Sequence, residues 1–199
     1  MRSFPYEFAS QRRPLFHPQE PSSFEGDILE IGPGRGDFLL AEAEAQPAQR
    51  FVAIEIKKRR YYKLVKRVEK KDLKNILLIQ GDARIVLPAC FPEGTFAKIY
   101  VLFPDPWPKR RHTSMRLLSC EFLAALARVL RRGGELILAT DAQEYLKWVT
   151  RNVNQIPEFE STALGESGES PSIDWAPTTY EKRWRAEGRT IRFVGYRKS

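Results

Sequence analysis

Between Asp27 and Asn154 the chain alternates short apolar runs with longer amphipathic segments, and this alternation limits the possible folds more than any other feature. Apolar runs predict strands at 27–31, 50–56, 76–80, 98–103 and 135–140. Apolar side chains at helical spacing predict helices at 37–46, 57–71, 114–131 and 143–154. Strands joined through helices pair in parallel, so we predict an α/β fold with a doubly wound sheet covered by helices on both faces.

The C-terminal part of the sequence has a different pattern. The segments 158–163 and 191–197 predict two strands that pair with each other. Between them, 165–177 is rich in Gly, Ser and Pro and predicts a mobile loop. There is no internal repeat and no linker, so we expect 1–199 to form a single domain in which 1–25 is a short N-terminal arm.

Charge and composition narrow the class of partner. The net charge of +8 at pH 7 favours a polyanion such as a nucleic acid. Basic residues cluster within 57–74, at Lys109–Arg116 and within 182–198; for the first cluster a solvated helix face is the open alternative. No apolar run is long enough for a membrane span. The two cysteines and two histidines lack metal-ligand spacing, which predicts a cytoplasmic protein without a metal site.

A glycine-rich turn, Glu30–Gly36, follows the first predicted strand. Glycines in a strand-to-helix turn let the backbone approach a ligand closely, and the helix N-terminus favours negative charge there. The spacing G-x-G-x-G differs from the G-x-G-x-x-G of dinucleotide-binding enzymes. Together with Glu30 it resembles the first motif of class I S-adenosylmethionine-dependent methyltransferases. A tight loop without a ligand is the alternative.

Carboxylates recur where the later strands end, at Glu55, Asp82, Asp105 and Asp141. Parallel strands end at the same edge of a sheet, so these side chains should gather near the glycine-rich turn. Glu55 is placed to accept two hydrogen bonds from a ribose diol, and an exposed Glu without a ligand is the alternative. Two interpretations are open for Asp82. It could contact a ligand at this edge of the sheet, or it could cap the next helix, as an Asp before a helix commonly does.

The segment Phe103–His112 combines a carboxylate, Asp105, with flanking prolines, Trp107 and four basic side chains. The prolines restrict the backbone and make the loop stiff. A carboxylate, a flat ring and nearby cations suggest a site for a base within a larger nucleic acid, although packing is the alternative for Trp107. Near the C-terminus, Thr178 and Glu181 have the spacing of a capping box, which predicts a helix start.

The combination of these motifs resembles the bacterial tRNA (guanine-N7)-methyltransferase family over about 27–197. The resemblance implies a class I methyltransferase (Rossmann-like) fold, with a mostly parallel seven-stranded sheet and an antiparallel C-terminal strand. It also implies transfer of a methyl group from S-adenosyl-L-methionine to N7 of the variable-loop guanine in tRNA. The stretch Arg111–Arg116 is less basic than the family pattern.

The resemblance implies roles for individual residues. Asp105 would be the catalytic carboxylate. Cofactor contacts would come from Glu30, Gly32, Gly34, Gly36, Glu55, Asp82 and Asp105. Substrate contacts would come from Lys109, Asp141, Thr178 and Glu181. RNA contacts would come from Arg110, Arg111, His112 and Arg116. No metal is expected, tRNA is the expected partner, and a monomer and a homodimer are both open.

Other functions remain possible at this stage. A class I methyltransferase could act on another RNA or another base atom, and a methyltransferase fold could bind RNA without catalysis. An NAD-dependent oxidoreductase shares the fold, but the glycine spacing and the lack of a hydride-transfer site disfavour it.

Overall fold

The structure is a computed structural model that describes residues 27–162 and 177–199. The predicted N-terminal arm at 1–25 lies outside these residues, as does the predicted mobile loop at 165–177 apart from Pro177. Within the described ranges, none of the helices combines the length and the apolarity that a transmembrane span needs.

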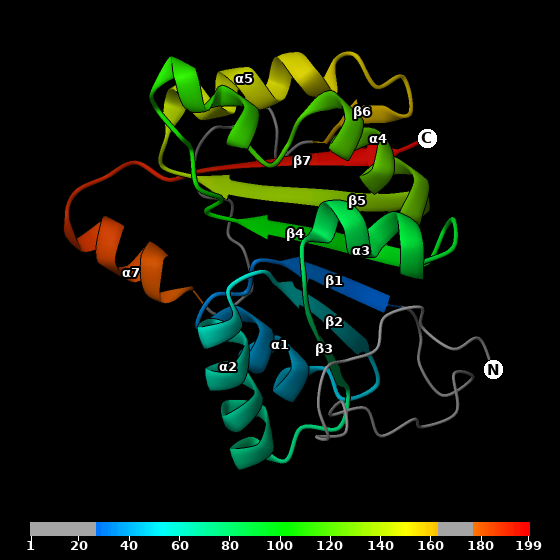
Figure 1. The fold of residues 1–199 in the computed structure, drawn as a ribbon, viewed down its shortest axis with the longest axis vertical. Helices are drawn as coiled ribbons and strands as arrows, with labels where there is room; N and C mark the ends of the chain where they lie inside the picture. The colour runs from blue at the N-terminus through cyan, green and yellow to red at the C-terminus, as the bar shows by residue number, and fades with distance from the viewer. Residues whose placement is uncertain (1–26, 163–176) are drawn as a thin grey trace.

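A seven-stranded sheet with the order β3-β2-β1-β4-β5-β7-β6 forms the centre of the fold (Figure 1). Strands β1 to β5 pair in parallel, whereas β7 is antiparallel to both β5 and β6. The predicted parallel sheet and the predicted C-terminal strand pair are therefore confirmed. The strands are β1 Asp27–Ile31, β2 Arg50–Glu55, β3 Ile76–Gln80, β4 Phe96–Leu102, β5 Leu130–Thr140, β6 Phe159–Ser161 and β7 Arg192–Lys198.

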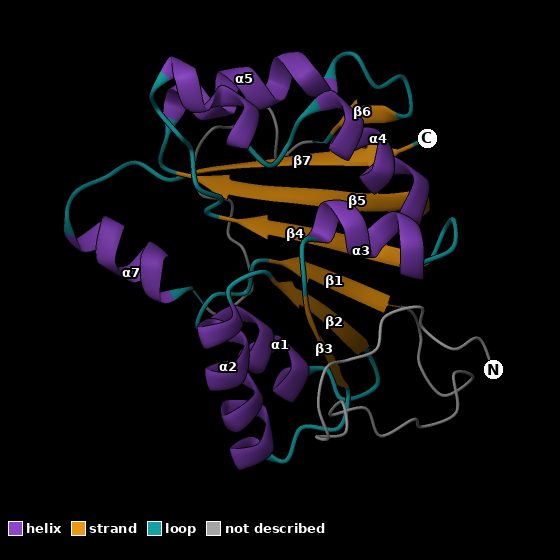
Figure 2. Cartoon of the chain, in the orientation of Figure 1, coloured by secondary structure: helices purple, strands orange, loops and turns teal. Residues whose placement is uncertain are grey.

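Helices cover both faces of the sheet, as the doubly wound prediction requires (Figure 2). One apolar cluster joins the sheet to α3, α4 and α5, and a second joins it to α1 and α2. The helices are α1 Asp37–Ala45, α2 Lys58–Lys71, α3 Ala83–Cys90, α4 Cys120–Val129, α5 Gln143–Val153 and α7 Thr179–Ala186, with a 3-10 helix η2 at Arg110–Met115.

The predicted helix at 114–131 is wrong at both ends. Its first residues belong to η2, and α4 begins only after Ser119, whose hydroxyl accepts a hydrogen bond from the Phe122 N–H. At the other end the chain enters β5 at Leu130, which is fully buried and pairs with Phe96. A register shift follows this pair, so Gly133 and Gly134 lie within a bulged strand. Sheet pairing overrides the local helical pattern here.

Close packing of α1 against α2 explains one glycine of the glycine-rich turn. Gly36 precedes α1 with a φ of 77°, and a Cβ atom there would lie 2.2 Å from the Leu64 Cδ1 of α2. An ion pair of 2.8 Å between Arg67 and Asp37 joins the two helices beside this contact. The lack of a side chain at Gly36 therefore lets Leu64 of α2 pack against the start of α1.

Replacing Gly36 with Ala should destabilise the protein by about 2–4 kcal/mol. About 1–2 kcal/mol comes from the left-handed backbone and the rest from overpacking against Leu64. Gly133→Ala is the matched control, because Gly133 has a φ of 74° but its Cβ would meet no heavy atom of the described chain within 4 Å. Urea unfolding should show the larger loss for Gly36→Ala; equal losses would contradict the packing role.

Candidate active site

A cleft of about 400 Å³ lies at the carboxyl edge of the parallel strands. Its walls come from the turn after β1, the loop after β4, the residues after β5 and helix α7. Six predicted site residues meet there: Glu30, Gly32, Gly34, Asp105, Asp141 and Thr178. Among the described residues, the cleft lining does not include Gly36, Glu55, Asp82, Lys109, Glu181 or the predicted RNA contacts.

Gly32 and Gly34 shape the floor of the cleft. Their φ angles are 71° and 60°, in the left-handed region that side chains disfavour. A Cβ on Gly32 would meet no heavy atom of the described chain within 4 Å, and one on Gly34 would meet only the Gly32 carbonyl at 3.9 Å. The glycines thus expose backbone to open space, which suits a ligand that lies directly on the turn.

Glu55 holds the glycine-rich turn in place from the end of β2. Its Oε2 accepts a hydrogen bond of 3.1 Å from the Gly34 N–H, and its Oε1 accepts one of 2.7 Å from the Lys57 N–H. The side chain is buried. A carboxylate retains acceptor capacity beyond these two bonds, so the ribose contact stays a prediction, next to a structural role that is already clear.

Glu30 is the most unusual titratable group of the site. Its side chain is buried, and Oε2 has no hydrogen-bond partner among the described residues. Burial, followed by repulsion from Asp37, Glu55 and Glu42, raises its pKa to about 8. An orphaned carboxylate beside a cleft fits a ligand with a cationic, hydrogen-donating group such as the ammonium of an amino acid. The site therefore fits the cofactor that the resemblance implies, S-adenosylmethionine.

Asp82 acts as the N-cap of α3. Its Oδ1 accepts a hydrogen bond of 2.9 Å from the Arg84 N–H, and its side chain pairs with the Arg84 guanidinium at 2.6 Å. Hydrogen bonds from the Arg84 side chain hold the pKa of Asp82 below its ordinary value despite partial burial. The capping interpretation is confirmed, whereas the cofactor contact stays a prediction.

The Asp105 loop has a strained backbone on both sides of the carboxylate. Phe103 has a φ of 54° and Trp107 a φ of 43°, values that cost of order 1–3 kcal/mol each for bulky residues. The Phe103 N–H donates to the Ala139 carbonyl of β5 at 2.8 Å. Asp105 itself is 71% exposed at the mouth of the cleft, with the Lys57 ammonium 4.0 Å away. The loop thus holds an exposed carboxylate at the mouth, with the Lys57 ammonium as its ion-pair partner.

Arg116 fixes the same loop through hydrogen bonds to its backbone. Its guanidinium donates to the carbonyls of Pro106 at 3.0 Å and Trp107 at 3.3 Å. It also lies over the Trp148 ring, with 5.2 Å from Cζ to the ring centroid. These contacts occupy the side chain within the protein. Its predicted RNA contact stays a prediction, and its observed role is to fix the Asp105 loop.

The other residues of the predicted RNA-contact stretch lie in and around η2. Arg111 is exposed, and its Nε donates to the His112 ring. Lys109, just before η2, is exposed as well, and its predicted substrate contact stays a prediction. The His112 ring packs edge-on against Trp107, with 5.6 Å between centroids. The Trp107 ring is not part of the described cleft lining. Arg110 begins η2.

An aromatic wall that the sequence did not predict forms part of the cleft lining. Trp184 of α7 lies 4.9 Å from the Phe103 ring and 5.3 Å from the Tyr180 ring, measured between centroids. The Tyr180 hydroxyl accepts a hydrogen bond from Arg60 of α2, and Thr179 donates one to Asp37 of α1. Only the four-residue spacing of Tyr180 and Trp184 could have indicated this wall.

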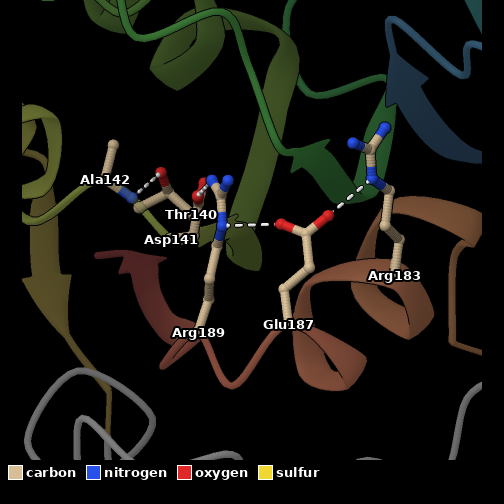
Figure 3. A network of polar contacts seen from close by, with 6 residues as sticks. All are labelled: Thr140, Asp141, Ala142, Arg183, Glu187 and Arg189. Atoms are coloured by element: carbon tan, nitrogen blue, oxygen red, sulfur yellow. Dashed lines mark hydrogen bonds and ion pairs between the residues drawn. The ribbon is translucent and has the colours of Figure 1, made fainter.

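Asp141 lines the cleft and belongs to a charged network (Figure 3). It accepts a hydrogen bond of 2.9 Å from Arg189, which also pairs with Glu187 at 3.1 Å. Glu187 in turn pairs with Arg183 at 2.8 Å. The network ties the end of β5 to the segment after α7, and it gives Asp141 a structural partner beside its predicted substrate role.

Thr178 lines the cleft, whereas Glu181 is buried. The Thr178 hydroxyl accepts a hydrogen bond of 3.0 Å from the Glu181 N–H, so the predicted helix start is confirmed. The Glu181 carboxylate is buried and pairs with Arg185 at 2.8 Å. The substrate contacts of both stay predictions. No group of three or more His, Cys, Asp or Glu side chains in 27–162 and 177–199 could hold a metal ion.

The fold and the residues of the cleft define a class I methyltransferase. The crystal structure of the 16S rRNA methyltransferase KamB has the same fold, with a TM-score of 0.63, 17% identity, and coverage of 89% of this chain and 90% of that one. A family model described as a putative methyltransferase matches residues 25–194.

Curated relatives identify the family within this class. The tRNA (guanine-N(7)-)-methyltransferase of Paramagnetospirillum magneticum is 36% identical over 179 residues, which are 89% of this chain and 74% of the relative. The enzyme of the same name from Rhodospirillum rubrum is 38% identical over 172 residues, 85% of this chain and 67% of the relative. The chain belongs to the tRNA (guanine-N(7)-)-methyltransferase family.

Replacing Glu30 with Gln should remove a pH dependence of folding. Because the pKa of Glu30 is raised from 4.5 to about 8, the folded chain binds a proton that the unfolded chain releases. The free energy of unfolding of the wild type should fall from about pH 5 to pH 8, by up to about 1.4 kcal/mol per unit. Thermal unfolding without cofactor should show a smaller fall for Glu30→Gln, with Glu160→Gln at an exposed position as control. Equal falls would contradict the burial argument.

Replacing Arg116 with Leu should slow methyl transfer by about 10–100-fold, because the Asp105 loop loses two hydrogen bonds and its alignment. S-adenosylmethionine affinity should stay unchanged in calorimetry. The dependence of tRNA affinity on salt concentration separates the two roles of this side chain. If Arg116 fixes the loop, the salt slope of tRNA binding stays unchanged in the variant. If Arg116 contacts a phosphate, this slope falls by about one. A lower slope together with unchanged turnover would overturn the loop role.

Proposed function

We propose that this chain transfers a methyl group from S-adenosylmethionine to N7 of the variable-loop guanine in tRNA. The observation that carries the proposal is the meeting of the glycine-rich turn and the Asp105 loop in one cleft, in a member of this family. In the same proposal, 1–199 forms one methyltransferase domain that works in the cytoplasm, and tRNA is its partner.

The cofactor end of the cleft is the side with Gly32, Gly34 and Glu30. S-adenosylmethionine, when bound, supplies an electrophilic methyl group on a sulfonium. Gly32 and Gly34 leave room for it against the backbone. The orphaned Glu30 Oε2 would accept a hydrogen bond from its ammonium, which would favour the ionised form of Glu30. Glu55 keeps the turn in the geometry that this requires.

The chemistry of the acceptor assigns a positioning role to Asp105. Guanine N7 carries an in-plane lone pair and no proton, so its methylation needs no general base. Alignment and electrostatics then remain as the main tasks of the enzyme. Asp105 can accept hydrogen bonds from guanine N1–H and the 2-amino group. Its exposure at the cleft mouth and the stiff loop around it support this role.

The aromatic wall supports binding of an extruded base. A guanine that is stacked within folded tRNA must leave its stack before N7 can align with a donor in a cleft. The rings of Trp184 and Tyr180 line the cleft and offer a flat apolar surface. Trp107 does not line it, which favours the packing interpretation for that side chain.

Replacing Asp105 with Asn should lower kcat/KM for tRNA by about 100-fold or more, because an amide cannot accept both hydrogen bonds from the guanine edge. Binding of S-adenosylmethionine should be retained in calorimetry. Asp72→Asn is the control, since Asp72 is 80% exposed at the end of α2. Wild-type turnover by Asp105→Asn would remove the proposed role.

The function itself is tested with labelled S-adenosylmethionine and unmodified tRNA, followed by borohydride–aniline cleavage at N7-methylguanine. A single cut in the variable loop would support donor, acceptor and atom together. Label without a cut would point to another base atom. Cofactor binding without label, over several RNAs, would favour a methyltransferase fold that binds RNA without catalysis.

A further inference from the structure

Helix α2 carries an unusual concentration of positive charge. Its sequence, KRRYYKLVKRVEKK, contains eight Lys or Arg residues and one carboxylate, Glu69. Only Leu64 and Val68 are fully buried, so most of the helix surface faces away from the core. The motifs singled out in the sequence do not include this helix, and the cleft residues do not explain its charge.

The cations of α2 divide into two groups by their partners. Arg67 pairs with Asp37 and Lys71 with Glu44, and both pairs fasten α2 to α1. Five others are exposed and have no ion-pair or hydrogen-bond partner among the described residues: Lys58, Arg59, Lys63, Lys66 and Lys70. The last four follow one another at spacings of four, three and four, which places them in one row along the helix. We call this row the α2 stripe.

The α2 stripe is unfavourable for the isolated protein. Like charges three and four residues apart destabilise a helix by a few tenths of a kcal/mol per pair. The first turn is also basic where the helix dipole favours acids, and Lys57 at the N-cap provides no side-chain hydrogen bond within the described chain. A solvated face would not require four aligned cations of one sign. A bound polyanion would attract these cations and so offset their mutual repulsion.

The stripe starts beside the cleft. Lys57, just before α2, lies 4.0 Å from the Asp105 carboxylate, and Arg60 in the first turn lines the cleft and contacts Tyr180. From there α2 runs away from α7 along the outside of the fold (Figure 1). Eleven residues separate Arg59 from Lys70, a rise of about 16 Å. A nucleic-acid strand whose base enters the cleft can therefore continue along the stripe.

We infer that the α2 stripe binds backbone phosphates of the tRNA next to the guanine that enters the cleft. The inference rests on the proposed function for the identity of the RNA. Lys and Arg at this spacing contact phosphates without reading sequence, so the stripe contributes affinity and orientation. The exposed Tyr62 ring borders the row and offers a surface for a sugar or an unstacked base. The stripe also compensates for the weakly basic stretch at Arg111–Arg116, since it supplies phosphate contacts from another element.

Two variants with the same loss of charge test the inference. The stripe variant is Arg59→Gln/Lys63→Gln/Lys66→Gln/Lys70→Gln. The control variant neutralises four other exposed cations, near the amino ends of β4 and β5 and in the last turn of α5: Lys98→Gln/Arg131→Gln/Arg132→Gln/Arg151→Gln. Filter binding of a tRNA transcript without cofactor, over a series of salt concentrations, measures affinity and its salt slope for both.

The stripe variant should bind tRNA about 10–100-fold more weakly, and its salt slope should fall by about two to four. The control variant should stay within about threefold of the wild type. Thermal unfolding separates docking from a structural role, because removing like-charge repulsion should leave the melting temperature of the stripe variant unchanged or higher. Equal effects of the two variants, or a stripe variant that binds like the wild type, would overturn the inference.

The design also separates this inference from the proposed function. The wild type could methylate the variable loop while the stripe variant loses no more tRNA affinity than the control. That result would support the proposed function and overturn the inference about the stripe. Conversely, the wild type could fail to methylate N7 while the stripe variant selectively loses tRNA binding. That result would support the inference about the stripe and overturn the proposed function. If wild-type protein does not bind tRNA, both fail.

Discussion

β1 pairs in parallel with β2 on one side and with β4 on the other, and this central pairing positions the whole site. The order of the strands reverses there, so the turn after β1 and the loop after β4 leave the sheet side by side and enclose a crevice. The Gly32 N–H bonds to the Ile54 carbonyl of β2, and the Phe103 N–H to the Ala139 carbonyl of β5. Each functional loop thus begins with a backbone hydrogen bond to the neighbouring strand, which continues the hydrogen bonding of the sheet.

The two loops reach their geometry by different means. The glycine-rich turn adopts left-handed angles at little cost and is fixed by the buried Glu55 carboxylate. The Asp105 loop adopts such angles with two aromatic residues, and contacts from Arg116 and from Trp184 of α7 oppose the strain. The rigid result presents the Asp105 carboxylate to whatever occupies the cleft.

Charge is separated between the inside and the outside of the site. The interior side holds buried carboxylates at Glu30 and Glu55, and their mutual repulsion contributes to the raised pKa of Glu30. The outer surface carries the cations of the α2 stripe and of Lys109 and Arg111. A cationic cofactor fits the first environment and an RNA backbone the second. This separation explains how a protein of net charge +8 can keep buried acidic side chains next to the place where a cationic cofactor would bind.

The sequence by itself determined the features that depend on neighbouring residues: the strand-helix alternation, the glycine-rich turn and the caps at Asp82 and Thr178. Only the tertiary structure decided which distant groups meet. Arg116 bonds across a turn that no periodicity encodes, and the Arg189–Asp141 and Thr179–Asp37 contacts join residues 48 and 142 positions apart. The predicted helix at 114–131 failed for the same reason, because sheet pairing and burial of Leu130 outweigh local helical preference.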